Sequence, residues 1–216
     1  LPESIHGDPE RQLMLMGGIL LWGTRLTVNW ASGWTGIDHE DWRYTMFRKR
    51  YPTPVFEFIN LFGLHGFPTV MVFAGLTGAI VAFGDPTPAG TLGWVGFSVI
   101  CVGTLFELVS DLQLARHRRS GSTALLATGL WRWSRHPNYF GEVLVWWGIW
   151  LLAIDAGPEH WWTVLGPASI TAMFVLVSIP MMEKRMAGRR EGWEAYAART
   201  SRLLPLPPRR HTRGAR

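Results

Sequence analysis

Residues 129–142, with the sequence GLWRWSRHPNYFGE, decide how this chain is organised. The segment begins as a basic, polar loop and leads directly into an apolar run from Val143 to Ile154. Pro137 predicts the start of a helix, because proline is tolerated at the first helical position, where its missing N–H would be unpaired anyway. We therefore expect Arg135 and His136 just outside the N-terminus of a helix.

This predicted helix start has the properties of an anion site. A helix N-terminus carries four unpaired N–H groups and the positive end of the macrodipole, and Arg132 and Arg135 stand beside it. Asn138 and Glu142 are four residues apart, so both lie on one helix face at or just below the membrane surface. A carboxylate at this depth costs free energy, so one that is found there usually has a function. The alternative is that the polar residues are interfacial anchors and caps, with Glu142 neutralised by a neighbour.

Composition favours a helical membrane protein over a soluble domain. The 216 residues are 48% hydrophobic with a mean hydropathy of only +0.10, because apolar blocks alternate with basic connectors. Several blocks approach the roughly 20 apolar residues that a bilayer span needs. Thirteen Trp fit the aromatic belts at membrane interfaces. The single cysteine, Cys101, excludes a disulfide framework and a Cys-based zinc site, and we expect no metal centre.

The apolar blocks predict an all-α integral membrane fold with about five transmembrane helices. The expected spans are residues 13–30, 67–83, 91–109, 139–154 and 161–181, with the third continuing beyond the membrane to residue 119. A short surface or half-inserted helix is expected at 55–66, a polar loop at 33–51, and turns at 84–90 and 155–160. Residues 1–216 are expected to form one membrane-embedded domain. Its basic C-terminal segment starts at residue 183 and is expected to end in a flexible tail, residues 206–216. Whether a further span precedes Leu1 is left open.

The positions of the basic residues support this layout and assign its orientation. Residues 33–53 carry four Lys and Arg, residues 111–138 carry five and residues 183–216 carry ten, whereas the two turns at 84–90 and 155–160 carry none. Basic loops prefer the cytoplasm, so all three basic segments are predicted to face inward. The net charge of +5 therefore reflects topology and contact with membrane lipids, and no nucleic-acid partner is expected.

Polar residues inside the predicted spans point to a pocket. At 100° per residue Glu107, Asp111 and Arg118 lie within about 40° of one another and form one stripe. Arg25 and Asn29 interrupt the first span and should face other helices or a cavity, because a charge facing lipid costs about 2.5 to 3.5 kcal/mol. The orientation of the chain in the membrane explains basic residues at the spans' ends, but it does not explain acidic residues beside them. The chain also lacks the dinucleotide-binding, phosphate-loop, metalloprotease and serine-hydrolase motifs of soluble enzymes.

The residues in several motifs resemble the bacterial branch of the steroid 5-alpha-reductase family, and the likeness covers nearly the whole chain. The motifs are SRHPNYFGE at 134–142, FELVSDLQ at 106–113, MEKR at 182–185, Tyr196, RTS at 199–201, Pro205, EDWRY at 40–44 and NLFG at 60–63 with Pro68. The RHPNY core with its following glycine and acid is also similar to the sterol C14 and C7 reductases.

This resemblance implies an integral membrane reductase that passes hydride from NADPH to an activated carbon–carbon double bond of a steroid or other lipophilic enone. It implies an inner-membrane location in bacteria with the NADPH site facing the cytoplasm. The positions it assigns to NADPH are Glu107, Asp111, Arg118, Arg135, His136, Asn138, Tyr139, Glu142, Glu183, Arg185, Tyr196 and Arg199. Arginines and a helix N-terminus suit the phosphates, and amide and carboxylate groups suit the nicotinamide carboxamide.

The substrate end departs from the family pattern. Where the animal enzymes use a Tyr three residues before an Arg, this chain has Trp22 before Arg25, and Glu107 stands where they have Asn. Tyr44, Glu57 and His65 are the candidate catalytic hydrogen-bond donors, because they are polar groups close to or within the second apolar segment.

Two other classes of function stay open. Isoprenylcysteine and phospholipid methyltransferases share a related Arg-His-Pro segment but use S-adenosylmethionine, which carries no phosphate for so many arginines. The other is a non-enzymatic membrane protein whose basic loops bind anionic lipid.

Overall fold

The computed structural model describes residues 7–34, 36 and 40–209, and its regular elements within these residues are helices. Four continuous helical segments are long and apolar enough to cross a membrane: Thr53–Gly84, Thr91–Arg119, Pro137–Ala156 and Pro158–Ala187. This confirms an all-α membrane protein.

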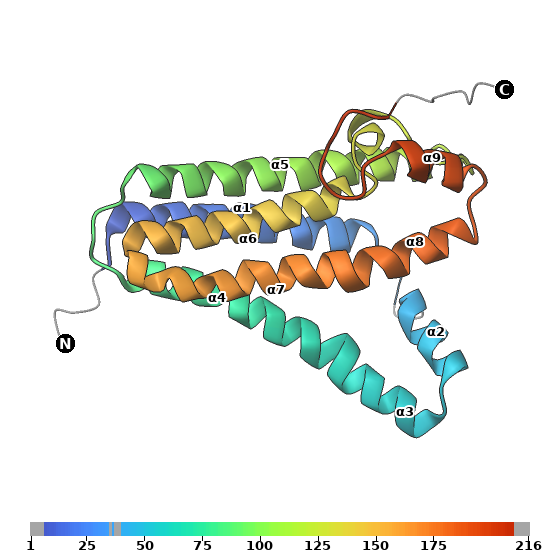
Figure 1. The fold of residues 1–216 in the computed structure, drawn as a ribbon, viewed down its shortest axis with the longest axis horizontal. Helices are drawn as coiled ribbons and strands as arrows, with labels where there is room; N and C mark the ends of the chain where they lie inside the picture. Colours follow the sequence, from blue (N-terminus) through green and yellow to red (C-terminus); the bar gives the residue numbers. More distant parts are fainter. Residues whose placement is uncertain (1–6, 35, 37–39, 210–216) are drawn as a thin grey trace.

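Helix α1 (Pro9–Ser32) lies alongside the spanning helices α5 (Thr91–Arg119) and α6 (Pro137–Ala156) (Figure 1). It starts where the side chain of Asp8 accepts a hydrogen bond from the Arg11 amide at 2.8 Å, which caps the helix. Its length matches a bilayer span. With α1 added to the four apolar segments, the helical bundle is consistent with the expected five spans.

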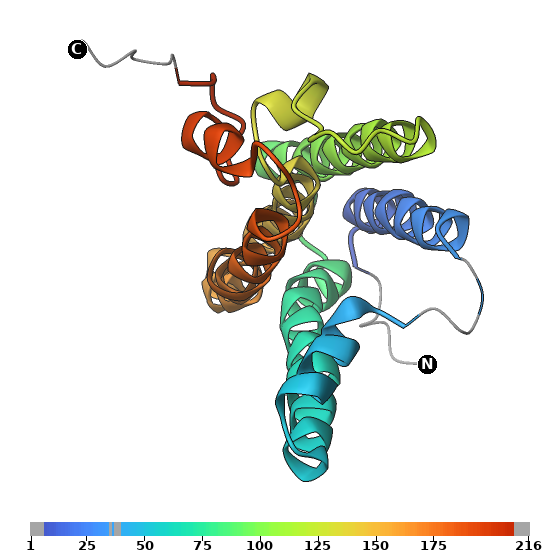
Figure 2. The ribbon, with the colours of Figure 1, turned by 90° about the vertical axis from the view of Figure 1, so that its right-hand side faces the viewer.

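The second apolar segment is one continuous helix. The segments α3 (Thr53–Phe58), η2 (Ile59–Gly66) and α4 (Phe67–Gly84) follow each other without interruption, so the expected break at Gly66 is wrong. The physical reason is the π-helical η2, in which the Phe67 amide donates to the Phe62 carbonyl five residues earlier. This wider turn lets the helix pass Pro68, which has no N–H to donate. The long helix diverges from the rest of the bundle (Figures 1 and 2).

The predicted polar loop at 33–51 is wrong over its second half, where the chain forms helix α2 (Trp42–Arg50). Asp41 caps this helix by accepting a hydrogen bond from the Arg43 amide at 2.9 Å. The Arg185 guanidinium lies 4.2 Å from the ring centre of Trp42, which links α2 to helix α8 (Ile179–Ala187). Residues 35 and 37–39 of this predicted loop lie outside the described residues.

Helices α5 and α6 pack in direct backbone contact through glycines. A Cβ at Gly103 would lie 2.6 Å from the carbonyl oxygen of Gly141, and a Cβ at Gly96 would lie 2.8 Å from that of Gly148. Only glycine permits this separation. The glycines Gly93, Gly96 and Gly103 of the predicted span at 91–109 favour close helix contact by their small size, and for Gly96 and Gly103 these distances confirm it. The predicted start of α6 at Pro137 is also confirmed.

The last span is a composite helix, made of η4 (Pro158–Val164), α7 (Leu165–Met173), η5 (Phe174–Ser178) and α8. It continues to Ala187, and α9 (Trp193–Arg199) follows. The segment from residue 183 therefore contains the end of α8 and the whole of α9, and is more structured than the sequence indicates.

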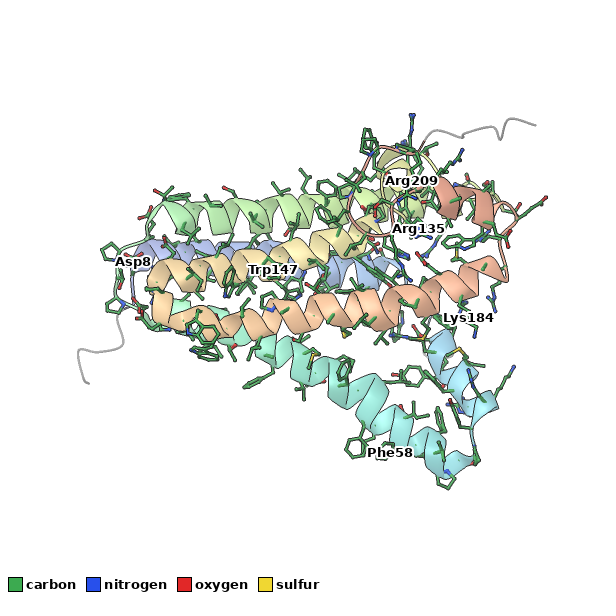
Figure 3. The ribbon with its side chains drawn as sticks, viewed as in Figure 1. Asp8, Phe58, Arg135, Trp147, Lys184 and Arg209 are labelled. Carbon is green, nitrogen blue, oxygen red and sulfur yellow. The ribbon has the colours of Figure 1, made fainter. Side chains whose placement is uncertain are left out.

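The two ends of the bundle differ in character. Asp8 lies at one end, whereas Arg135, Lys184 and Arg209 gather at the other (Figure 3). At the first end the buried Arg11 guanidinium pairs with Asp155 at 3.0 Å and donates to the Thr87 carbonyl at 2.7 Å. The basic segments share the second end, as the alternation of charges along the sequence requires.

Candidate functional site

An arginine surrounded by three carboxylates forms the polar centre of the bundle. Arg25 of α1 forms an ion pair with Glu107 of α5, and its Nη1 lies 3.0 Å from Oδ2 of Asp111. Its Nη2 lies 3.7 Å from Oε2 of Glu142, on α6. These four residues are called the Arg25 cluster below. Three helices that are remote in the sequence thus meet at one guanidinium.

Two tryptophans complete the environment of Glu142. The Trp22 Nε1–H donates to Oε2 at 3.0 Å, and the Trp146 Nε1–H donates to Oε1 at 2.9 Å. The two indole rings meet edge to face with centroids 5.4 Å apart. Glu142 is therefore held rigidly, and the expectation that a neighbour neutralises it is met by Arg25.

The Arg25 cluster is deeply buried, and some of its polar atoms lack a hydrogen-bond partner within the described residues. The side chains of Arg25 and Glu107 are only 8% and 2% exposed. Such charges persist in an apolar interior only when they are paired. One guanidinium faces three carboxylates, so negative charge is in excess when all three are ionised. Within the described residues, Arg25 Nε and Glu107 Oε1 are buried without a hydrogen-bond partner.

A cavity of about 1240 Å³ lies between α1 and α5 and borders this cluster. Its membrane end is largely apolar, lined by Gly17, Leu20, Leu21, Thr104 and Leu108. Its other end is polar and basic, lined by Asn29, Ser32, Gln113, Arg116 and Arg119. Arg25 and Asp111 lie between the two ends. Residues 17 to 32 of α1 rise about 22 Å along the helix axis, so the cavity is longer than one leaflet of the roughly 30 Å hydrocarbon core.

The N-terminus of α6 is occupied by a carboxylate of the chain itself. Glu183 of α8 lies 3.2 Å from Arg135 Nη1 and 3.3 Å from His136 Nε2, and its second oxygen lies 3.3 Å from Arg202 Nε. Burial lowers the pKa of the Arg135 guanidinium, an effect that the charge of Glu183 opposes. Glu183 therefore pairs with the basic side chains beside the start of α6, whereas no side-chain cap is bonded to the first N–H groups of this helix. Anion binding by those N–H groups stays a prediction.

Aromatic rings line this helix start. The imidazole of His136 stacks on the ring of Tyr139 with ring centres 5.3 Å apart, and the ring centres of Tyr139 and Phe174 are 4.7 Å apart. The Arg135 guanidinium lies 5.9 Å from the ring centre of Trp193. Tyr139 and His136 thus form part of the packing at the helix mouth.

Hydrogen bonds attach residues 196–206 to the loop before α6, and this attachment is called the C-terminal clip below. The Arg135 amide donates to the Ser201 carbonyl at 2.8 Å, and the Leu206 amide donates to the Trp133 carbonyl at 3.1 Å. The Tyr196 hydroxyl donates to the Trp131 carbonyl at 2.6 Å, and burial raises the pKa of Tyr196 to about 12. Residues 206–209, expected to belong to the flexible tail, begin within this clip, and residues 210–216 lie outside the described part.

The remaining predicted cofactor residues are not gathered at one point. Asn138 is partly buried in the first turn of α6, whereas Arg118 and Arg199 are exposed. The structure gives none of these three a side-chain hydrogen bond or ion pair within the described residues. Arg185 contacts Trp42, as described above. Of the twelve predicted positions, the structure thus joins three at Arg25 and four, Arg135, His136, Tyr139 and Glu183, at the start of α6.

The three predicted catalytic residues lie on the diverging helix and on α2. The Tyr44 hydroxyl and His65 Nε2 are 3.2 Å apart, and His65 Nδ1 lies 2.8 Å from the Asn60 carbonyl. Glu57 is exposed and accepts a hydrogen bond from the Asn60 side chain at 3.4 Å. None of the three lines the cavity between α1 and α5. Tyr44 and His65 are paired, and their catalytic role stays a prediction.

Sequence reasoning left Arg25 and Trp146 out of the site. The signal for Arg25 was a charge inside an apolar span, which requires a buried partner. Trp146 carried no signal, because it is one of many tryptophans in apolar runs.

One group of described residues has the spacing of metal ligands. Ligand atoms of Asp85, Glu159 and His160 lie within 4.8 Å of one another at the opposite end of the bundle. Asp85 there accepts from the Thr87 amide and contacts His160 at 3.5 Å, so these groups already satisfy one another.

Comparison with known proteins places the chain in a family. It is 25% identical over 220 residues to the uncharacterized protein C594.04c of Schizosaccharomyces pombe, covering 90% of this chain and 64% of that protein. It is 30% identical over 78 residues to the uncharacterized protein C7D4.09c of the same yeast, covering 35% of this chain and 27% of that protein. The chain thus spans less than two thirds of the length of either relative.

No solved structure matches the chain. A family model described as "protein of unknown function (DUF1295)" matches residues 4–200, which include the Arg25 cluster, the cavity and the start of α6. The chain therefore belongs to this family of steroid 5-alpha-reductase-like membrane proteins.

Proposed function

We propose that this protein is a membrane reductase that transfers hydride from NADPH to the activated carbon–carbon double bond of a steroid-like or other lipophilic enone. The observation that carries the proposal is the cavity between α1 and α5, whose basic end and apolar end meet at Arg25 and Asp111. A polar nucleotide and an apolar substrate need such opposite surfaces in contact with each other.

The residues at the basic end suit a dinucleotide phosphate. Arg116 and Arg119 line the cavity, and Arg118 lies two helical turns from Asp111 on the same face of α5. Guanidinium groups bind phosphate oxygens through paired hydrogen bonds. These arginines would hold the phosphates of NADPH at the cytoplasmic surface.

The Arg25 cluster suits the nicotinamide end. Asp111 lines the cavity where its two ends meet, and its carboxylate could accept a hydrogen bond from a carboxamide N–H. NADPH, when bound, would supply the hydride, and its ring gains positive charge as the hydride leaves. The excess negative charge of Glu107, Asp111 and Glu142 would stabilise this charge in a site of low dielectric constant.

The overall reaction conserves atoms and charge. The enone receives a hydride at its β-carbon and a proton at its α-carbon, and becomes the saturated ketone. The proton would come from water, because the paired Tyr44 and His65 do not line the cavity. By resemblance to the bacterial branch of the family, the protein would lie in a bacterial inner membrane with the basic end of the cavity facing the cytoplasm.

The test is a titration of the purified protein with NADPH, followed by NADPH oxidation in the presence of a panel of enones. We expect Glu107→Gln and Asn138→Ala to weaken NADPH binding at least tenfold. The matched control is Glu159→Gln, which neutralises an exposed carboxylate at the opposite end of the bundle. If wild-type protein shows no NADPH binding, the proposal is wrong.

One observation favours a second function. Excess negative charge would also attract the sulfonium of S-adenosylmethionine, as in the isoprenylcysteine and phospholipid methyltransferases. The arginines at the cavity's basic end favour NADPH, because S-adenosylmethionine has no phosphate. A thermal-shift comparison of the two cofactors separates these functions. Stabilisation by S-adenosylmethionine alone would select the methyltransferase.

A further inference from the structure

A histidine and two carboxylates face one another at the end of the bundle opposite the basic segments. Asp85 directly follows α4, and Glu159 and His160 lie on η4, so the three residues join two connections that are remote in the sequence. One ligand atom from each residue lies within 4.8 Å of the other two. The Asp8 amide donates to the Asp85 carbonyl at 2.9 Å, which places them beside Asp8 (Figure 3). These three residues are called the His160 group below.

The contacts by which the His160 group satisfies its own charges are long. His160 Nε2 lies 3.5 Å from Asp85 Oδ2 and 4.0 Å from Glu159 Oε1. A direct hydrogen bond between charged groups places such atoms about 2.7 to 2.9 Å apart. Two ligands of a tetrahedral zinc ion lie about 3.4 Å apart, because the metal–ligand bonds are about 2.0 to 2.1 Å long. The spacing therefore fits three ligands around one ion, with the fourth position left for water.

Two of the three ligands are held in place by residues outside the His160 group. Asp85 Oδ1 accepts from the Thr87 amide at 2.8 Å, which leaves Oδ2 directed at His160. The His160 carbonyl accepts from the hydroxyl of the buried Thr163 at 2.8 Å. Such outer hydrogen bonds orient metal ligands. The side chain of Glu159 is 68% exposed, so it can move toward an ion at little cost.

The charges around the His160 group favour a cation. The carboxylates of Asp85, Asp155 and Glu159 carry three negative charges, against one positive charge on Arg11. The Arg11 guanidinium pairs with Asp155 at 3.0 Å and lies 3.9 Å from Oδ1 of Asp85, the oxygen that is not directed at His160. With neutral His160 two negative charges are left over, and a divalent ion would offset both.

We propose that Asp85, Glu159 and His160 bind a divalent transition-metal ion, with Zn²⁺ as the best match. One imidazole nitrogen and two carboxylate oxygens are zinc ligands, whereas Ca²⁺ and Mg²⁺ prefer a larger set of oxygens. The expectation of no metal centre rested on the lack of cysteines, which this set of ligands does not need. The ion would join the turn between α4 and α5 to the turn between α6 and α7, far from the basic end of the cavity.

The experiment is a calorimetric titration with Zn²⁺ of the untagged, detergent-solubilised protein, after removal of metal with EDTA. Wild type should bind one Zn²⁺ per chain, and about tenfold or more tightly than Ca²⁺, because of the nitrogen ligand. His160→Ala and Asp85→Asn should each weaken Zn²⁺ binding by about tenfold or more, since even the loss of a group that orients a ligand costs about 10- to 100-fold. Asp85→Asn preserves the side-chain volume, so it tests the ligand even when His160→Ala fails to fold.

Two variants serve as matched controls. His117→Ala removes a histidine at the far end of α5, and Glu10→Gln neutralises an exposed carboxylate in the first turn of α1, at the same end as the His160 group. Each should change the affinity for Zn²⁺ by less than about twofold, because screened charges outside the site contribute little. Co²⁺ is the spectroscopic probe: wild type should give the visible absorption of tetrahedral Co²⁺, and His160→Ala should not.

Unfolding provides a second readout. At about 100 times its Kd, Zn²⁺ should raise the Tm of wild type by about 5 °C or more and leave that of His160→Ala unchanged. Absence of stoichiometric Zn²⁺ binding by wild type, or wild-type affinity in both His160→Ala and Asp85→Asn, overturns the proposal. Equal affinity for Ca²⁺ and Zn²⁺ overturns it as well, because it would show that the imidazole is not a ligand.

Discussion

Arg25 of α1 and Glu107 of α5 form an ion pair that is almost completely removed from solvent. It joins the two helices that form the walls of the cavity, at the point where the cavity changes from apolar to basic. One contact therefore holds the cavity walls in register and supplies the charges that the proposed chemistry needs. Because Arg25 has three acidic partners, the two members of the pair should respond very differently to substitution.

Arg25→Met is expected to destabilise the protein by about 3 to 5 kcal/mol, because it leaves three carboxylates without their cation. Glu107→Gln should cost less than about 1.5 kcal/mol, since Arg25 keeps Asp111 and Glu142. Thermal or denaturant unfolding in detergent measures both. Arg48→Met is the control, because the pair of Arg48 with Glu40 is exposed to solvent and its loss should leave the free energy of unfolding nearly unchanged. Equal losses for Arg25→Met and Glu107→Gln would contradict this account.

Gly141→Ala should lower stability by about 1 to 3 kcal/mol, because the new Cβ would lie 2.5 Å from the Gly103 carbonyl oxygen and force α5 and α6 apart. Gly23→Ala in α1 is the matched control. A Cβ at Gly23 would meet no neighbouring group within 4 Å, and alanine is the better helix former, so this variant should gain about 0.5 to 1 kcal/mol. A Gly141→Ala variant as stable as wild type would show that the close approach is not required.

Glu183→Gln should loosen the C-terminal clip, because Glu183 neutralises Arg135 and Arg202 and accepts from His136. We expect a loss of about 1.5 to 3 kcal/mol, the contribution of a hydrogen bond to a charged group, and faster tryptic cleavage after Arg202. Glu194→Gln, in the exposed first turn of α9, should leave the cleavage rate unchanged. Unaltered cleavage in Glu183→Gln would refute the role of this carboxylate.

Tyr196 should titrate near pH 12, because burial raises its pKa from 10.0 to about 12. A raised pKa in the folded state means that the neutral hydroxyl contributes stability below about pH 10, and that this contribution is lost as the pH rises through about 12. Ultraviolet absorbance of tyrosinate measures this. The difference between wild type and Tyr196→Phe should have its midpoint near 12, and a midpoint near 10 would disprove the burial of this hydroxyl.

Much of the fold follows from local signals. The apolar run after Pro137 and the proline's own chemistry predicted the start of α6 correctly, and Gly96 and Gly103 indicated a close helix contact. The break expected at Gly66 and the loop expected before Tyr51 were wrong. A π-helical turn at 59–66 and the cap at Asp41 depend on hydrogen bonds that hydropathy does not register.

The candidate site was predicted in part. The sequence grouped Glu107, Asp111 and Arg118 in one polar stripe, the resemblance added Glu142 to the same site, and Arg25 had to avoid lipid. The structure brings all of these except Arg118 together. It did not indicate that Arg25 is their common partner. The anion site at Arg135 and His136 was also predicted, but its carboxylate comes from Glu183, 47 residues further along the chain.

The sequence by itself determined the membrane class, the positions of the spans and which charged residues had to be buried, because hydropathy and helical periodicity are properties of neighbouring residues. The tertiary structure alone decided which of these charges meet and where the cavity opens. Those outcomes depend on the relative register of α1, α5 and α6. That register is set by the glycine contacts between α5 and α6, by the ion pairs of Arg25 and by the hydrogen bond from Trp22 to Glu142, which joins residues 120 positions apart in the chain.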